Sequence, residues 1–169
     1  MNTKLKNRLI YLGSLVMLLA AFAFWYKVTY SMERTENRGI NSATLSSKVI
    51  IATQGSEFKD AIVTNIINFY KKDSVHIKII DVSQLQNFEP RIYNAIVILH
   101  TWEYGKPPLA VTQFISENEA SKTKTIVFAT SGSGGNKIQS IDALAGESIL
   151  ESAGDISDEI IERLEILIH

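Results

Sequence analysis

The sequence predicts an α/β protein in which one transmembrane helix precedes a doubly wound parallel sheet. Two observations lead to this fold class. The segment from Leu9 to Tyr26 carries no charged residue. Beyond residue 47, short apolar runs alternate with segments that repeat apolar residues every three to four positions. Such alternation is typical of strand–helix–strand units, in which the strands are parallel and helices cover both faces of the sheet.

The uncharged N-terminal segment has the length and the flanking residues of a membrane-spanning helix. At about 1.5 Å per residue, residues 9–26 cover most of a hydrocarbon core about 30 Å thick. Trp25 and Tyr26 are of the type that anchors a helix at the membrane interface. We therefore expect residues 1–30 to be a transmembrane anchor that contacts the lipid bilayer. A cleaved signal peptide is the alternative, because Ala21-Phe22-Ala23 has the small-any-small form of a cleavage site.

The distribution of charge predicts the orientation and excludes some classes of function. Basic residues crowd the N-terminal flank of the apolar segment, so the positive-inside rule predicts a single-pass protein of the cell membrane with an extracytoplasmic domain. The net charge of −1 argues against a nucleic-acid partner. The chain lacks cysteine and its three histidines lie far apart, so we expect no metal site.

The rest of the chain divides into a tether and one compact domain. Residues 31–47 are polar and have no apolar period, so we expect a tether there and a folded domain over residues 48–169. Four apolar runs predict buried strands, and a short fifth is expected near the end: 48–53, 75–82, 93–100, 124–130 and about 146–150. Helices are expected over about 61–72, 108–119 and 157–168, the last capped by Asp155 or Ser157, with a short weak helix between residues 81 and 91.

Three unusual loops follow predicted strands, at the edge where open α/β sheets bind ligands. The first, residues 53–57, combines a glycine and hydroxyls with a helix N-terminus, which suits a phosphate. The second, residues 101–108, places two aromatic residues in a turn, which suits a flat ligand. The third, residues 130–136, offers many backbone donors and little bulk. Each loop also has a purely structural interpretation: a helix cap at Thr53 or Ser56, aromatic residues that cover strand ends, and a flexible loop.

From about Lys48 onward these segments resemble the flavodoxin superfamily, and the short bacterial flavodoxins in particular. The resemblance rests on residues 53–57, 98–108, 125–134 and 142–148. It implies a flavodoxin-like, five-stranded parallel sheet and FMN as the cofactor. It also implies cofactor-binding roles for three groups of residues: Thr53, Gln54, Gly55 and Ser56 at the phosphate; Thr101, Trp102, Tyr104 and Gly105 in the loop that covers the ring; and Ser131 and Gly132 at the ring edge.

The resulting hypothesis is a membrane-anchored, FMN-binding electron-transfer protein whose partner is a redox protein or a quinone. Two alternatives remain: an FMN-dependent NAD(P)H:quinone reductase, and a flavodoxin-like binding module that has lost its cofactor. The second alternative is favoured by Ala52, Gln54 and Glu57, which stand where the family's phosphate loop usually has hydroxyl residues. Glu57 would also bring a negative charge near a phosphate dianion. No catalytic residue is predicted, and any enzymatic activity would be that of an oxidoreductase.

Overall fold

The computed structural model describes residues 3–30, 34–138 and 140–169, and the chain divides into two compact units, residues 1–32 and 33–169. The first unit contains one long helix, α1 (Thr3–Tyr30). Its part from Thr3 to Tyr26 is long and apolar enough to cross a membrane, judged by length and composition. A signal sequence near the N-terminus would meet the same criterion, so both interpretations of this segment stay open.

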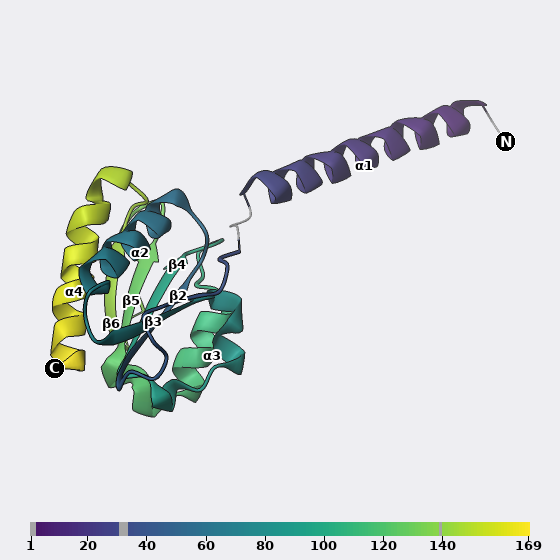
Figure 1. The fold of residues 1–169 in the computed structure, drawn as a ribbon. Helices are drawn as coiled ribbons and strands as arrows, with labels where there is room; N and C mark the ends of the chain where they lie inside the picture. Colours follow the sequence, from purple (N-terminus) through teal and green to yellow (C-terminus); the bar gives the residue numbers. More distant parts are fainter. Residues whose placement is uncertain (1–2, 31–33, 139) are drawn as a thin grey trace. The chain divides into compact units, whose positions relative to one another are not determined.

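The second unit contains a six-stranded sheet with the order β1-β3-β2-β4-β5-β6 (Figure 1). The strands, in chain order, are β1 (Arg38–Ile40), β2 (Ser47–Thr53), β3 (Val75–Asp81), β4 (Ala95–Thr101), β5 (Thr125–Thr130) and β6 (Asp142–Gly146). All pairs from β3 to β6 are parallel. Counted along the chain, these five parallel strands lie in the order second, first, third, fourth, fifth, which is the doubly wound order of flavodoxin-like folds.

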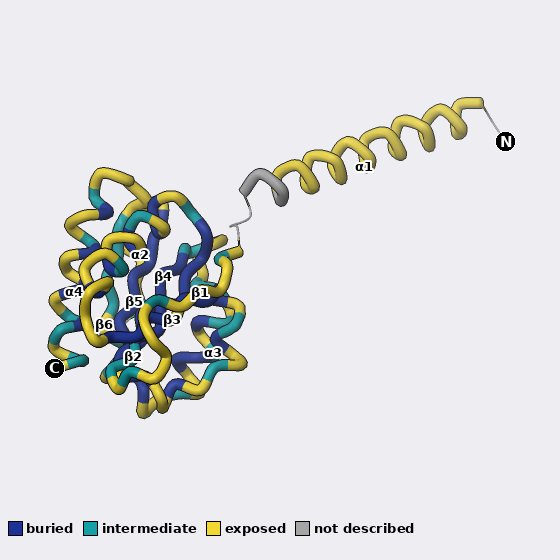
Figure 2. The backbone as a smooth tube through the Cα atoms, viewed as in Figure 1, coloured by how far each residue is buried: buried dark blue, intermediate teal, exposed yellow. Residues whose placement is uncertain are grey.

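Helices cover both faces of this sheet. α2 (Glu57–Tyr70) and α4 (Ala153–Ile168) lie on one face, and α3 (Leu109–Glu117) lies on the other (Figure 1). Along β2, Val49 and Ile51 belong to the core beneath α2 and α4, while Ile50 and Ala52 belong to the core beneath α3. The central strands are therefore buried on both faces, as Figure 2 shows, which explains their continuous apolar runs.

The antiparallel strand β1 was not expected from the sequence. It lies within residues 31–47, which we predicted to be a tether, and it adds a sixth strand to the predicted five. Both predictions are wrong at this point, because Arg38–Ile40 pairs with Ile77–Ile79 and covers the backbone edge of β3. A strand of three residues is too short to show an apolar period. Residues 31–33 lie outside the described part of the chain.

The C-terminal region also differs from the prediction. The last strand is Asp142–Gly146 rather than about 146–150, because β6 pairs in register with β5 and ends where Ser131 N donates to Gly146 O. The apolar pair Ile149 and Leu150, which suggested a strand, lies partly exposed beyond it. Helix α4 starts at Ala153 with Ser152 at its N-cap, about one turn earlier than expected, and neither predicted cap is used.

The predicted weak helix between β3 and β4 is replaced by two short 3₁₀ turns, Val82–Asn87 and Pro90–Ile92. Within residues 34–138, no α-helix connects these two strands. The α3 face of the sheet consequently has less helical cover over β3 than a fully wound fold would give it.

Asn41 fixes the end of β1, and its loss is expected to destabilise the second unit. Its backbone is left-handed (φ 62°), and its Nδ2 lies 3.1 Å from Tyr70 O and 2.7 Å from Val75 O. Asn41→Ala removes these donors and disfavours the backbone conformation, so we expect a loss of about 1–3 kcal/mol in the free energy of unfolding. Urea denaturation followed by circular dichroism measures it. Asn37→Ala is the control, because Asn37 is exposed and makes a solvent-exposed hydrogen bond to Gln84, so its loss should change stability by under about 0.5 kcal/mol. Equal losses in the two variants would contradict this role.

Candidate functional site

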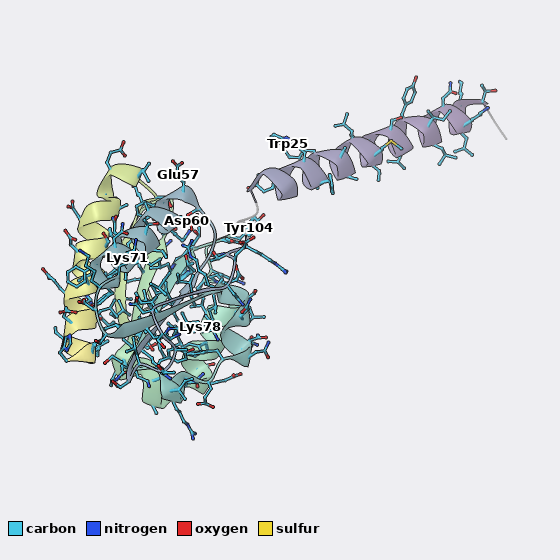
Figure 3. The ribbon with its side chains drawn as sticks, in the orientation of Figure 1. Trp25, Glu57, Asp60, Lys71, Lys78 and Tyr104 are labelled. Atoms are coloured by element: carbon cyan, nitrogen blue, oxygen red, sulfur yellow. The ribbon has the colours of Figure 1, made fainter. Side chains whose placement is uncertain are left out.

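The three predicted loops meet at the carboxyl edge of the sheet. Gln54 N, after β2, donates to Leu99 O of β4 at 3.2 Å, and Trp102 N, after β4, donates to Thr130 O of β5 at 2.8 Å. Ser131 N, after β5, donates to Gly146 O of β6 at 3.1 Å. These backbone bonds connect the strand ends in the order in which they lie in the sheet. In Figure 3, Glu57 at the start of α2 and Tyr104 in the loop after β4 lie at the same end of the domain.

Gln54 joins the ends of β2 and β4 through its side chain. Its Oε1 accepts from Thr101 N at 2.7 Å, and its Nε2 donates to Glu103 Oε1 at 3.1 Å. The chain leaves β2 towards β3 on one side and reaches β4 on the other, so this position is the topological switch point of the sheet. The amide of Gln54 therefore holds the first and second loops together at the place where doubly wound folds bind their ligands.

Lys59, which the sequence analysis did not single out, lies buried beside this switch point. It belongs to the first turn of α2, where its side chain is fully shielded from solvent. Its Nζ donates to Thr101 Oγ1 at 2.8 Å and to Ser56 Oγ at 3.3 Å. None of the salt bridges found among residues 3–30, 34–138 and 140–169 includes Lys59. The sequence signal was its spacing, since Lys59 occupies the helical stripe that continues with Ile62 and Ile66.

The electrostatics of Lys59 favour an anionic ligand. Burial lowers the pKa of its ammonium to about 8, and the nearby carboxylates of Asp60 and Glu103 offset part of that effect. At pH 7 the group is therefore still charged. A buried charge without an ion-pair partner is unfavourable, and an anion bound beside it would remove that penalty.

A chain of hydroxyls connects Lys59 to a cavity. Thr101 Oγ1 lies 2.9 Å from Thr130 Oγ1, and both threonines line a cavity of about 310 Å³ together with Ser131, Gly132 and Ile149. The cavity lies at the carboxyl ends of β4, β5 and β6. Its volume is at the lower end of the range of small-molecule sites.

Several buried polar atoms at the carboxyl ends of β4 and β5 have no hydrogen-bond partner in the described part of the chain. They are Ser131 Oγ, Trp102 Nε1 and both ring nitrogens of His100. Burial lowers the pKa of His100 to about 4, so its imidazole is neutral at pH 7. Because buried polar groups are nearly always paired in folded proteins, Ser131 Oγ, which lines the cavity, marks a place where a polar ligand would complete the structure.

The second loop turns sharply and exposes its tyrosine. Glu103 and Lys106 exchange two backbone hydrogen bonds, which encloses Tyr104 and Gly105 in a two-residue turn. Both enclosed residues have positive φ, 52° and 73°, as a type I′ turn requires. Tyr104 is 86% exposed. Gly105 adopts this backbone without strain, whereas Tyr104 does not, so the turn is strained at the residue whose side chain it exposes.

The predicted site residues thus fall into two groups. Ser131, Gly132 and Thr101 line the cavity, and Tyr104 and Gly105 form the exposed turn beside Trp102. By contrast, the residues predicted at the phosphate are largely occupied by the protein itself: Ser56 caps α2 by accepting from Lys59 N, Thr53 Oγ1 donates to Gln54 O, and Gln54 and Gly55 are buried. The cap at Ser56 agrees with the structural interpretation of this loop.

Comparison with known proteins finds a likeness among solved structures only. No protein-family model and no curated protein matches the sequence. Among solved structures, the chain is similar to a flavodoxin from the domain Archaea, with a TM-score of 0.49 and 18% sequence identity over 72% of this chain and 99% of that one. The assignment of the fold itself rests on the strand order described above.

Proposed function

We propose that the second unit binds FMN and that the whole chain is a membrane-anchored electron-transfer protein. The observation that carries this proposal is the buried ammonium of Lys59 at the switch point of a doubly wound sheet, which takes part in none of the salt bridges found among the described residues. An anionic group of the ligand would be expected beside it, and the phosphate of a mononucleotide is such a group.

In this proposal the phosphate lies over the first turn of α2, where backbone N–H groups and the helix dipole attract an anion. Lys59 lies beneath the loop and contributes its charge through Ser56 and Thr101. Glu57 is exposed in the first turn of α2, so solvent screens its repulsion of the phosphate. The charge that favours binding is buried and the charge that opposes it is not.

The flavin ring would then lie along the cavity of about 310 Å³, with Ser131 and Gly132 at its edge and the Trp102–Gly105 turn over its face. Bound FMN supplies the redox chemistry. The protein would position the ring, and Glu103 would disfavour a negatively charged reduced ring by an amount that solvent screening reduces, because Glu103 is exposed.

The residues 9–26 would hold the protein in the bilayer, with the domain on the extracytoplasmic side and a redox protein or quinone as partner. Extraction of membranes at high pH tests the anchor, because a spanning helix stays with the lipid. Release of the full chain into the soluble fraction would contradict it.

The direct test of flavin binding is a visible spectrum of the purified full chain in detergent after incubation with FMN and gel filtration. Retained flavin bands with quenched fluorescence are expected. A folded protein that elutes without flavin would favour a binding module that has lost its cofactor. The occupation of Thr53, Gln54 and Ser56 by protein contacts is the observation that favours this second candidate.

Trp102→Ala is expected to weaken FMN binding by about tenfold, because stacking of aromatic rings contributes about 0.5–1.5 kcal/mol beyond buried area. Titration of FMN fluorescence gives the dissociation constant. Trp25→Ala is the matched control, since Trp25 belongs to α1 and should leave the affinity unchanged. An unchanged dissociation constant for Trp102→Ala would remove this residue from the site.

Flavin affinity is also expected to fall as pH rises above about 8, the pKa of the Lys59 ammonium in the free protein. The stability of the free protein should change in the opposite direction. Between pH 8 and 10.5 the folded state has released the Lys59 proton and the unfolded state still holds it, so the free energy of unfolding rises with pH. FMN titrations and urea denaturation at several pH values across this range test whether the affinity falls and whether the free energy of unfolding rises. In Lys59→Met, the pH dependence of FMN affinity and that of the free energy of unfolding should both disappear between pH 8 and 10.5. If the variant keeps the pH profiles of the wild type, they do not arise from Lys59.

A further inference from the structure

A second cavity, of about 470 Å³, lies away from the candidate flavin site. Its lining comes from β1, from the start of β2, from β3 and from the 3₁₀ turn before β4, and it includes Arg38, Gly39, Lys48, His76 and Lys78. None of the residues that the flavin proposal uses lines it. It is therefore a separate feature of the second unit.

The cavity exists because no α-helix connects β3 and β4 in the described part of the chain. Along β3, Ile77 and Ile79 point into the core beneath α2 and α4, while His76 and Lys78 alternate with them and point to the opposite face. Lys78 is exposed there although it lies in the middle of a strand whose other residues are buried. In Figure 3, Lys78 lies over the strands and Lys71 lies at the end of α2, so the two lysines belong to different parts of the second unit.

The charge of this cavity is one-sided. Lys48 is the register partner of His76 in the neighbouring strand. His76 lies on the same face of β3 as Lys78, so Lys48 and Lys78 belong to the same face of the sheet. No aspartate or glutamate lines the cavity. No salt bridge in the described ranges includes Lys48, Lys78 or Arg38. This local positive charge contrasts with the rest of the unit, since acidic residues outnumber basic residues beyond Ala43.

We propose that this cavity binds the phosphate headgroup of an anionic phospholipid at the membrane surface. Three features support a lipid over a free anion. Basic residues near a membrane segment are attracted to anionic lipids. Arg38 follows Tyr30, the last residue of α1, by eight positions, so the connecting chain spans at most about 28 Å. Ile92 lines the cavity and is 58% exposed, which would give a lipid an apolar contact beside the basic groups.

The inference rests on the proposed membrane anchor and is independent of flavin binding. Bound headgroups would hold the sheet edge formed by β1, β3 and β2 against the bilayer. The domain would then keep a defined orientation at the membrane.

Lysine footprinting of the full chain tests this inference. The protein is reconstituted into nanodiscs of phosphatidylcholine alone, or of phosphatidylcholine with about one third phosphatidylglycerol, and acetylation rates are measured by mass spectrometry. We expect Lys48 and Lys78 to react about tenfold more slowly in the anionic discs. Lys71, an exposed lysine of the same unit, is the internal control and should change by less than about twofold. Equal protection of Lys71 and Lys78, or protection of neither, would overturn the inference.

Two further experiments distinguish a lipid headgroup from a free anion, and failure of the anchor from failure of the headgroup site. In neutral discs, added inorganic phosphate at millimolar concentration should not protect Lys78; protection there would assign the cavity to a free anion instead of a lipid. In the Lys78→Glu variant, anionic discs should no longer slow the acetylation of Lys48. In the Lys71→Glu variant, which has the same change of charge, they should still slow it. Absence of the protein from the disc fraction would overturn the anchor and this inference together, while absence of protection in disc-bound protein would overturn this inference alone.

Discussion

Lys59→Met is expected to raise the dissociation constant for FMN by about 100-fold while the domain stays folded. A charge-assisted hydrogen bond contributes about 1.5–3 kcal/mol, and Lys59 is the buried cation beside the proposed phosphate position. Methionine has a similar length and tolerates burial. Because replacement of a buried charge by an apolar group is often neutral or stabilising, the free energy of unfolding should stay the same or increase. Fluorescence titration and urea denaturation measure the two quantities.

Lys71→Met provides the matched control, because Lys71 is exposed after the last residue of α2. Its affinity for FMN should equal that of the wild type. If both variants bind FMN equally well, Lys59 does not attract the phosphate and the central observation behind the proposed function fails. Lys59→Gln keeps hydrogen-bonding capacity without charge, and an affinity close to that of Lys59→Met would assign the effect to the charge.

Phe128→Ala is expected to lower the free energy of unfolding by about 3–5 kcal/mol, which is the usual loss for a phenylalanine deleted from a core. Phe128 is fully buried on β5, and its ring lies 5.9 Å from that of Phe58 in α2. The ring also fills the space beside Gly146, where an added Cβ would meet Phe128 Cζ at 3.3 Å. Thermal denaturation followed by circular dichroism should show a melting temperature lower by about 10–20 °C.

Phe69→Ala is the control for this substitution. Phe69 lies on α2 but is 50% exposed, so its loss should change stability by about 1 kcal/mol or less. A loss for Phe128→Ala no larger than that for Phe69→Ala would mean that the sheet and α2 do not share the core described here. Since Gly146 ends β6 beside the candidate cavity, Phe128→Ala also tests whether packing beneath the site supports ligand binding.

The main strands and helices of the second unit were predictable because their periodicity is local. The run at residues 48–53 differs by one residue from β2, and the run at 124–130 by one residue from β5. A strand buried on both faces has to be continuously apolar, whatever its neighbours are. Strand β1 could not be predicted in this way, because Arg38–Ile40 becomes a strand only through its pairing with β3. The same holds for β6, whose residues are mostly half-buried and resemble a loop in sequence.

For this protein, the sequence by itself determined the apolar N-terminal helix, the alternation of strands and helices, and the loops at the carboxyl edge, since each depends on residues close together in the chain. Tertiary structure alone decided which side chains of those loops remain available for a ligand. It joined Gln54 to Glu103 and Lys59 to Thr101 across more than forty positions, and it buried the Lys59 ammonium. It also left β3 and β4 connected without an α-helix between them in the described part of the chain, so that Lys78 stays exposed. Burial and charge at a site depend on residues that meet only after folding, so neither can be read from local spacing.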